Sequence, residues 1–348
     1  TSTLQQDASR KLGYGARKTM QIAQQLYEGL SVGSHGQMGL ITYMRTDSTR
    51  VSETATTEAR GWLEAKYGKE YLPSKPPVYG KKKDAQDAHE AVRPSLASLA
   101  PEEAKPFLSN DQYKLYDLIW RRFMASQMEA ALYDQMTIVT TAGDYEIRSN
   151  ASKLKFAGFT AIYEESKDEK EKKEQMNLPD FTAGDFIHIR KIEPEQHFTQ
   201  PPPRYNEASL IKLMEEKGIG RPSTYAPTIE TIIARKYVER VQKQFHPTDL
   251  GKIVVDLLKE YFPRIVDVDF TAKMEDALDG IEEKNSSYQE VLAEFYGPFE
   301  TAVVKAEEEI GKIDVSTEPE VTDVPCENCA QMMVIKQGRF GTFMACPN

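Results

Sequence analysis

The chain has 348 residues, which is too long for one small core. Its composition, 40% hydrophobic and 28% charged residues, is that of a globular protein. No apolar run approaches the roughly 20 residues that cross a bilayer, and the first residues lack the basic and apolar regions of a signal peptide, so we expect a cytoplasmic protein with no membrane partner. The formal net charge of -10 argues against a nucleic-acid partner unless basic residues gather locally, because phosphate neutralisation requires Lys and Arg.

The first 130 residues predict a mainly helical region. Residues 16–27 have a helix-forming composition, and residues 40–44 form a short apolar, β-favouring run that ends in a polar cluster. A helical pattern resumes over residues 52–67. Residues 111–129 carry aromatic and aliphatic side chains at the spacing of an amphipathic helix.

Residues 131–198 predict a small β domain, because short β-like runs alternate there with Gly, Asn and Asp. The runs cover residues 137–141, 145–148, 153–156 and 186–192. Between them, the charged run from Lys167 to Glu174 has no apolar residues and predicts a solvated loop.

Residues 199–313 predict a second helical domain. Asn206 can cap a helix that runs to Lys217 and stops at Gly218. The later elements are a helix over 224–235, strands at 237–241 and 244–246, a helix from Thr248, and helices at 271–284 and 288–310. Helix, helix, two-stranded wing and helix is a winged-helix order, which is common but not unique in DNA-binding proteins.

One segment places a phenol, a guanidinium and a carboxylate at alternate positions: Met38-Gly-Leu-Ile-Thr-Tyr43-Met-Arg45-Thr-Asp47-Ser-Thr49. In an extended chain, the period of two puts Tyr43, Arg45 and Asp47 on one side. A phenol with a pKa of about 10 is a weak nucleophile, and an adjacent guanidinium would favour the phenolate and hold a phosphate. The alternative is a strand tyrosine beside a surface arginine, without chemistry.

Two further segments carry candidate binding residues. The first is Gln86-Asp-Ala-His89-Glu90-Ala-Val-Arg93-Pro94, in which a lone histidine is either structural or a ligand. The second includes Gly220-Arg221-Pro222-Ser223-Thr224-Tyr225, where Gly and Pro predict a tight turn and Ser or Thr can cap the next helix. The free N–H groups of such a helix start suit a phosphate, although a capped turn without a ligand has the same sequence.

The segment from Gly39 to Thr49 closely resembles the active-site segment of bacterial topoisomerase I, of the type IA family, and the two further segments resemble other signatures of that family. The family makes a transient 5′-phosphotyrosine bond in single-stranded DNA, passes a strand through the gap, reseals it, and so relaxes negative supercoils. The resemblance implies that Tyr43 is the nucleophile, that Arg45 stabilises the phosphate and that His89 hydrogen-bonds a phosphate near the cleaved bond.

The same resemblance implies a set of DNA-binding residues. Thr46 and Asp47 support the nucleophile, Arg93 lies close to His89, and the single strand is bound by Arg221, Thr224 and Tyr225, whose ring would stack on a base. DNA, especially single-stranded or negatively supercoiled DNA, is thus the expected partner.

All three cysteines follow residue 325, which excludes a disulfide framework for the rest of the chain and fits a reducing compartment. Cys326-x-x-Cys329 and Cys346 fit the first three ligands of a four-cysteine zinc ribbon, so residues 323–348 predict a truncated ribbon. Three thiolates alone would be a weak Zn2+ site, and a segment without metal is the alternative.

The chain opens on Thr1 rather than Met and ends just after a cysteine, from which we expect a fragment. By the resemblance, residues 1–130 form the catalytic helical domain, 131–198 part of a β arch and 199–313 a DNA-binding domain, all in a monomeric, nucleoid-associated toroid. The family's Toprim domain, with its acidic Mg2+ site, would be missing, because no Asp-x-Asp-x-Glu cluster occurs. We therefore expect the fragment alone to bind DNA but to relax supercoils poorly.

Three alternative functions remain open at this stage. Topoisomerase III, a decatenase, and reverse gyrase share the tyrosine chemistry. A catalytically inert module that binds single-stranded DNA through its winged-helix segment is the alternative from another class, and the presence of Tyr43, Arg45 and His89 argues against it, because pure binding needs no positioned phenol.

Overall fold

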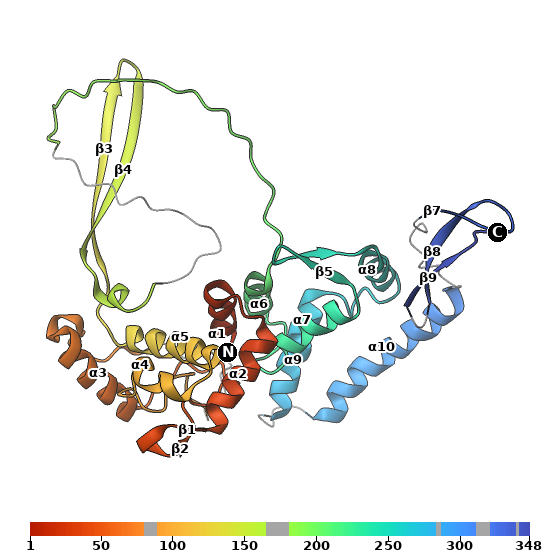
Figure 1. Cartoon of the computed structure of the whole chain (residues 1–348), viewed down its shortest axis with the longest axis horizontal. Helices are drawn as coiled ribbons and strands as arrows, with labels where there is room; N and C mark the ends of the chain where they lie inside the picture. Colours follow the sequence, from red (N-terminus) through yellow and green to blue (C-terminus); the bar gives the residue numbers. More distant parts are fainter. Residues whose placement is uncertain (80–88, 165–180, 283–286, 311–320, 339–340) are drawn as a thin grey trace. The chain divides into compact units, whose positions relative to one another are not determined.

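The computed structural model describes residues 1–79, 89–164, 181–282, 287–310, 321–338 and 341–348 (Figure 1). Its internal contacts divide the chain into two compact units. The first unit is Thr1–Leu213 with Pro222–Ala226, and the second is Met214–Arg221 with Pro227–Asn348. Within the described residues, no helix combines the length and apolar character that a membrane span requires.

The first unit begins with the helical region that the sequence predicts. Its helices are α1 (Ser2–Asp7), which continues as a π-helical turn (Ala8–Leu12), α2 (Ala16–Glu28), α3 (Glu53–Tyr67), α4 (Pro101–Ala104) and α5 (Asn110–Ser126). Side-chain caps begin two of them: Ser52 accepts a hydrogen bond from the Ala55 N–H at 3.3 Å, and Ser109 forms a capping box with Gln112. The expected helices over 16–27, 52–67 and 111–129 are confirmed.

The core of this unit gathers around α5. Its apolar stripe is buried, and two of its aromatic side chains also hold the irregular segment that precedes α4. The Tyr116 hydroxyl donates to the Leu99 carbonyl at 2.8 Å, and the Trp120 indole N–H donates to the Ala97 carbonyl at 2.9 Å. Buried aromatic rings therefore fix the path of the chain just after the segment that contains His89.

The predicted strand over residues 40–44 is wrong. Two short strands, β1 (Leu30–Ser31) and β2 (Gln37–Met38), pair just before it. The run itself makes one isolated bridge, from Ile41 to Pro94, and bends at Met44. Its partner segment contains a proline, which has no N–H to continue a ladder, so the apolar pattern alone overestimated the strand.

In the described part of the predicted β region, the strands form one long hairpin. Strands β3 (Leu132–Ala142) and β4 (Tyr145–Phe156) pair antiparallel from Ala142–Tyr145 back to Leu132–Phe156, and the runs expected at 137–141, 145–148 and 153–156 lie inside it. Polar cross-strand pairs extend the ladder, including Thr137 with Asn150. No strand forms over 186–192, where a partner segment is not present among the described residues. The charged run at 167–174 lies outside the described residues.

Residues 206–261 form the expected order of two helices, a hairpin and a helix. These are α6 (Glu207–Glu216), α7 (Tyr225–Ala234), β5 (Val238–Val241), β6 (Gln244–Pro247) and α8 (Asp249–Tyr261), followed by α9 (Val268–Glu282) and α10 (Tyr288–Glu309). Asn206 caps α6 by accepting from the Ser209 N–H at 2.8 Å, and Thr248 caps α8 by accepting from the Gly251 N–H at 3.0 Å.

A small antiparallel sheet ends the described chain, with the order β7–β8–β9. Its strands are β7 (Val321–Pro325), β8 (Met332–Gly338) and β9 (Gly341–Ala345). The turn between β7 and β8 contains Cys326 and Cys329, and Cys346 directly follows β9. The sheet therefore brings the three cysteines to one end of the hairpins.

Candidate active site

The segment that carries Tyr43 is held on two sides by backbone hydrogen bonds. On one side, the Leu40 N–H donates to the Leu26 carbonyl at the end of α2, at 2.7 Å. On the other side, the Thr42 N–H donates to the Arg93 carbonyl at 2.9 Å, and the Ser95 N–H donates to the Leu40 carbonyl at 2.9 Å. Tyr43 thus lies on a chain whose position is fixed by elements from before and after it.

Burial alternates from Tyr43 to Asp47, although the chain bends at Met44. Met44 is 0% exposed and Thr46 is 3% exposed, whereas Arg45 is exposed and Tyr43 and Asp47 are half-buried. The phenol, the guanidinium and the carboxylate are therefore accessible at alternate positions, while the residues between them face the core. Such a surface can receive a phosphate without opening the fold.

Two aromatic rings flank Tyr43. The His89 ring stacks on it with 5.3 Å between centroids and an interplanar angle of 28°. The Tyr27 ring, from the last turn of α2, meets it in a T-shaped contact at 5.3 Å and 67°. The structure brings Tyr43 and His89 together, which periodicity could not predict because the two are distant in the sequence.

Arg93 is tied to its neighbours by all three guanidinium nitrogens. Nε donates to Glu90 at 2.8 Å, one terminal nitrogen donates to the Pro94 carbonyl at 2.9 Å, and the other donates to Ser52 at 3.4 Å. Burial opposes ionisation of Glu90, but the hydrogen bond and charge of Arg93, helped by the Ser52 N–H and by Arg50, outweigh it and lower the Glu90 pKa. Arg93 thus holds the His89 segment against the start of α3.

Thr46 performs a structural task in the same loop. Its hydroxyl accepts from the Ser48 N–H at 3.0 Å, its N–H donates to the Thr1 hydroxyl at 2.9 Å, and its carbonyl accepts from the Thr1 nitrogen at 2.8 Å. The Thr1 hydroxyl also donates to the Met44 carbonyl. These bonds fasten the residues after Tyr43 to the start of α1.

The residues expected to bind a single strand divide between the two units. In the second unit, the Arg221 guanidinium forms ion pairs with Asp279 at 2.7 Å and Asp276 at 3.5 Å. Burial opposes its charge, but the hydrogen bond and charge of Asp279 raise its pKa. In the first unit, Thr224 is exposed, and Tyr225 at the start of α7 is 6% exposed, so little of its ring is accessible for stacking.

Comparison with known families identifies the chain. A family model described as DNA topoisomerase matches residues 1–293. The chain belongs to the type IA family of bacterial DNA topoisomerases. Its structure is also similar to that of full-length topoisomerase I from Thermotoga maritima, with a TM-score of 0.77 and 37% sequence identity over 100% of this chain and 55% of that one. The chain therefore spans about 55% of the length of that relative.

The last part of this topoisomerase chain has a cysteine cluster. The Sγ atoms of Cys326, Cys329 and Cys346 lie within 4.8 Å of one another, and those of Cys329 and Cys346 are 3.3 Å apart. The backbone N–H groups of Asn328 and Cys329, with the Cys346 thiol, lower the Cys326 pKa to about 7. Three close thiols, one of them easily ionised, are a suitable ligand set for Zn2+.

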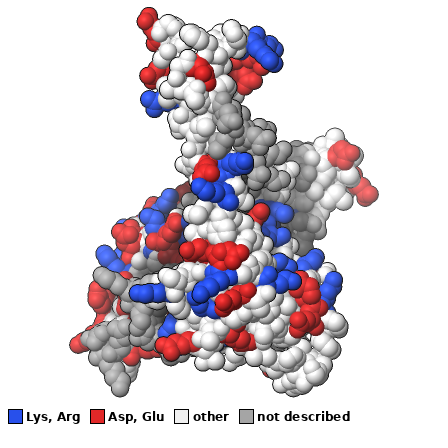
Figure 2. Space-filling view, turned by 90° about the vertical axis from the view of Figure 1, so that its left-hand side faces the viewer, with Lys and Arg blue, Asp and Glu red and all other residues white. Residues whose placement is uncertain are grey.

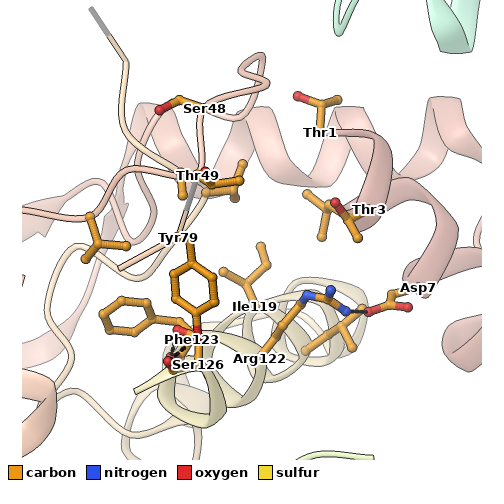
Figure 3. A pocket seen from close by; sticks show the side chains of 15 residues that line it. Thr1, Thr3, Asp7, Ser48, Thr49, Tyr79, Ile119, Arg122, Phe123 and Ser126 are labelled. Carbon is orange, nitrogen blue, oxygen red and sulfur yellow. Dashed lines mark hydrogen bonds and ion pairs between the residues drawn. The ribbon is translucent and has the colours of Figure 1, made fainter. Parts of the chain in front are cut away.

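A cavity of about 250 Å3 lies beside the loop that follows Tyr43 in the topoisomerase chain (Figure 3). Ser48 and Thr49 line it from the loop, and α5 contributes Arg122, which forms an ion pair with the buried Asp7 at 2.5 Å. The Tyr79 ring points toward α5, where its hydroxyl donates to the Ser126 carbonyl. Its lining mixes apolar side chains with hydroxyl groups, and its two charged residues, Arg122 and Asp7, are paired with each other.

One neighbour of the candidate nucleophile Tyr43 was not among the residues selected from the sequence. Tyr27 contacts Tyr43, but the helical pattern of residues 16–27 gave no reason to select it among the other residues of α2. The available signal was its position two residues before Gly29, at the helix end that the Gly39–Thr49 segment must approach. Contacts of this kind depend on tertiary structure.

Proposed function

We propose that this chain is the tyrosine-bearing part of a topoisomerase I that cleaves one DNA strand through a 5′-phosphotyrosine at Tyr43, passes a strand through the break and religates it. The observation that carries the proposal is the stack of His89 on Tyr43, beside the exposed Arg45. The similarity to a solved topoisomerase I supports this function over that of a topoisomerase III-like decatenase or a reverse gyrase.

The proposed chemistry is a balanced exchange of phosphodiester bonds. The Tyr43 oxygen attacks phosphorus and loses its proton, the bond from phosphorus to the 3′ oxygen of the preceding deoxyribose breaks, and that oxygen takes up a proton. Arg45 neutralises charge on the phosphate, and His89 donates a hydrogen bond to a phosphate oxygen. Religation is the reverse reaction, which requires no external energy source.

In this proposal, the supporting residues position the loop and the DNA and do not react with the phosphorus themselves. We assign Thr46 and Arg93 to holding the loop and the His89 segment, in keeping with their hydrogen bonds, and Asp47 to the accessible edge of the loop. A DNA phosphate that reaches Arg221 would have to compete with Asp279. Exposed Thr224 meets the strand directly, while Tyr225 supports the start of α7 or stacks on a base after local rearrangement.

Local basic residues carry DNA binding in this proposal, since the chain is acidic overall. On the face in Figure 2, Lys and Arg are interspersed with Asp and Glu, without a broad basic field. A chain of this charge distribution depends on a few well-placed cations, such as Arg45, rather than on a general positive surface. Affinity would then fall with salt by a modest slope.

The remaining assignments follow the family plan. Residues 131–198 would form part of the arch of a monomeric toroid, residues 199–313 a winged-helix-like DNA-binding domain, and residues 323–348 a truncated ribbon in which the three cysteines hold a structural Zn2+. By the family resemblance, Mg2+ would bind in the Toprim domain of the whole enzyme. A cytoplasmic, nucleoid-associated enzyme fits these roles.

Covalent trapping tests the proposal. The whole-length enzyme is incubated with 3′-end-labelled single-stranded DNA and Mg2+, then denatured, because the label 3′ to the break stays with a 5′-phosphotyrosine. We expect labelled wild-type protein and no label on Tyr43→Phe, which lacks the attacking oxygen. Tyr145→Phe, at an exposed position of the hairpin, is the matched control and should label normally. Label on Tyr43→Phe, or no label on the wild type, would refute the assignment. If Tyr43→Phe changed the DNA affinity and the wild type formed no covalent product, a non-catalytic binding module would be favoured.

A further inference from the structure

Tyr27 lies against the proposed nucleophile without belonging to the core of its own helix. The buried residues of α2 are Ala16, Thr19, Ile22, Ala23 and Leu26. Tyr27, in contrast, is 41% exposed, so burial does not account for its position. Its T-shaped contact with the Tyr43 ring is the specific interaction that the structure gives it.

The backbone of Gly39 lies very close to the backbone of Tyr27. A Cβ on Gly39 would lie 2.4 Å from the Tyr27 carbonyl oxygen, so only glycine lets the two chains meet there. Gly29, at a φ of 112°, lets the chain turn away after α2, and the β1–β2 hairpin returns it to the same place. The hydrogen bond from Leu40 to Leu26 then fixes the register of the returning chain against the helix end.

The two flanking rings limit different motions of the Tyr43 side chain. The His89 ring covers a face of Tyr43, while Tyr27 meets it at 67°. A ring held by one stacked and one edge-on neighbour has less freedom to rotate about its side-chain torsions. The direction of the Tyr43 oxygen therefore depends on both neighbours, one from each side of the segment.

We propose that Tyr27 is a positioning residue that holds the Tyr43 phenol in the orientation for in-line attack on the phosphodiester. The inference rests on the proposed function of Tyr43 and goes beyond it, because Tyr27 acts through its contact with the ring of the nucleophile. The aromatic ring of Tyr27, and not its hydroxyl, supplies the contact. Chemical rate rather than DNA affinity is the quantity that it controls.

Two substitutions separate the ring from the hydroxyl. In the whole-length enzyme, Tyr27→Leu keeps apolar volume and helix propensity but removes the ring, and it should slow single-turnover covalent labelling about 3- to 10-fold, the effect of losing one aromatic pair. Tyr27→Phe keeps the ring and should stay within about 2-fold of the wild type. The equilibrium affinity for the labelled single strand and the melting temperature should be unchanged in both variants.

A matched control and the contrary outcomes complete the test. Tyr145→Leu makes the same substitution at an exposed hairpin position and should label at the wild-type rate. Equal labelling rates for wild type and Tyr27→Leu would overturn the proposal, as would a slow Tyr27→Phe, or losses of affinity and melting temperature that match the loss of rate. Failure of the proposed function is distinguishable, because wild-type protein itself would then carry no label.

Discussion

At the scale of a single residue, Glu90 holds the Arg93 guanidinium through an ion pair of 2.8 Å. Glu90→Gln removes the charge, and we expect it to lower the free energy of unfolding by about 1–2 kcal/mol at pH 7, the worth of one charge-assisted hydrogen bond. Because folding lowers the Glu90 pKa, this stabilisation is present above the unfolded pKa of about 4.3 and is lost as the pH falls through the lower folded value. Thermal unfolding at pH 7 and near pH 3 measures both quantities.

The control for Glu90 is Glu64→Gln, which makes the same change on the exposed side of α3. It should have little effect at either pH, since isolated surface charges contribute little to stability. A Glu90→Gln defect of the same size at both pH values would mean that the ion pair with Arg93 is not its cause.

Single residues were predictable where local periodicity decides their exposure. The period of two correctly predicted that Tyr43, Arg45 and Asp47 are more exposed than Met44 and Thr46 between them, although the chain bends at Met44. The contact between Tyr43 and His89 was not derivable from spacing, because it depends on long-range pairing of the two segments. The DNA-binding roles of the residues stay predictions.

Elements were predictable from the sequence where local signals suffice. Helices have periodic apolar positions and local capping signals, and the predicted cap Asn206 and stop Gly218 did enclose α6. A strand requires a partner that the local sequence does not specify, which explains both the missing strand at 40–44 and the hairpin that is longer than its apolar runs. The ladder of β3 and β4 includes many polar residues, which an apolar pattern does not detect.

At the base of the β3–β4 hairpin, Gly158 packs closely against the backbone of residues 129 and 130. Gly158 has a φ of 49°, and a Cβ there would lie 2.5 Å from the Ala130 carbonyl, where the Phe159 N–H also donates to the Glu129 carbonyl at 2.9 Å. We expect Gly158→Ala to destabilise the fold by at least about 2 kcal/mol, because left-handed strain adds to a backbone clash. Urea unfolding followed by the fluorescence of Trp62 and Trp120, which contact each other in the adjoining core, measures the loss.

Gly143→Ala is the control that distinguishes backbone strain from a steric clash of the added Cβ. Gly143 lies in the hairpin turn at a φ of 62°, and a Cβ there would meet no atom within 4 Å. Gly143→Ala should therefore cost only the conformational part, about 1 kcal/mol. Equal losses of stability for Gly158→Ala and Gly143→Ala would show that the close approach of residues 129 and 130 to Gly158 adds nothing to the cost of the substitution.

At the scale of the whole molecule, our proposal divides the tyrosine chemistry and the Mg2+ site between different parts of the enzyme. The chain spans about 55% of its solved relative, and its described residues gather cysteines, not three carboxylates, into a metal-competent cluster. Mg2+ prefers carboxylate oxygens, so in our proposal the metal's share of phosphate neutralisation, beyond that of Arg45, would come from the rest of the enzyme. Tyr43 and its neighbours would then be positioned here but activated only in the whole enzyme.

This division predicts that the chain alone binds DNA but reacts poorly. With Mg2+ and 3′-end-labelled single-stranded DNA, the isolated chain should retard the oligonucleotide in a gel yet form at least about 100-fold less covalent complex than the whole-length enzyme, the effect of losing electrostatic stabilisation of the transition state. Tyr43→Phe in the isolated chain should leave the retardation unchanged, because binding does not use the phenol oxygen. Efficient relaxation of supercoiled DNA by the isolated chain would mean that its own residues supply the missing charge, and that the Mg2+ requirement has been assigned to the wrong part of the protein.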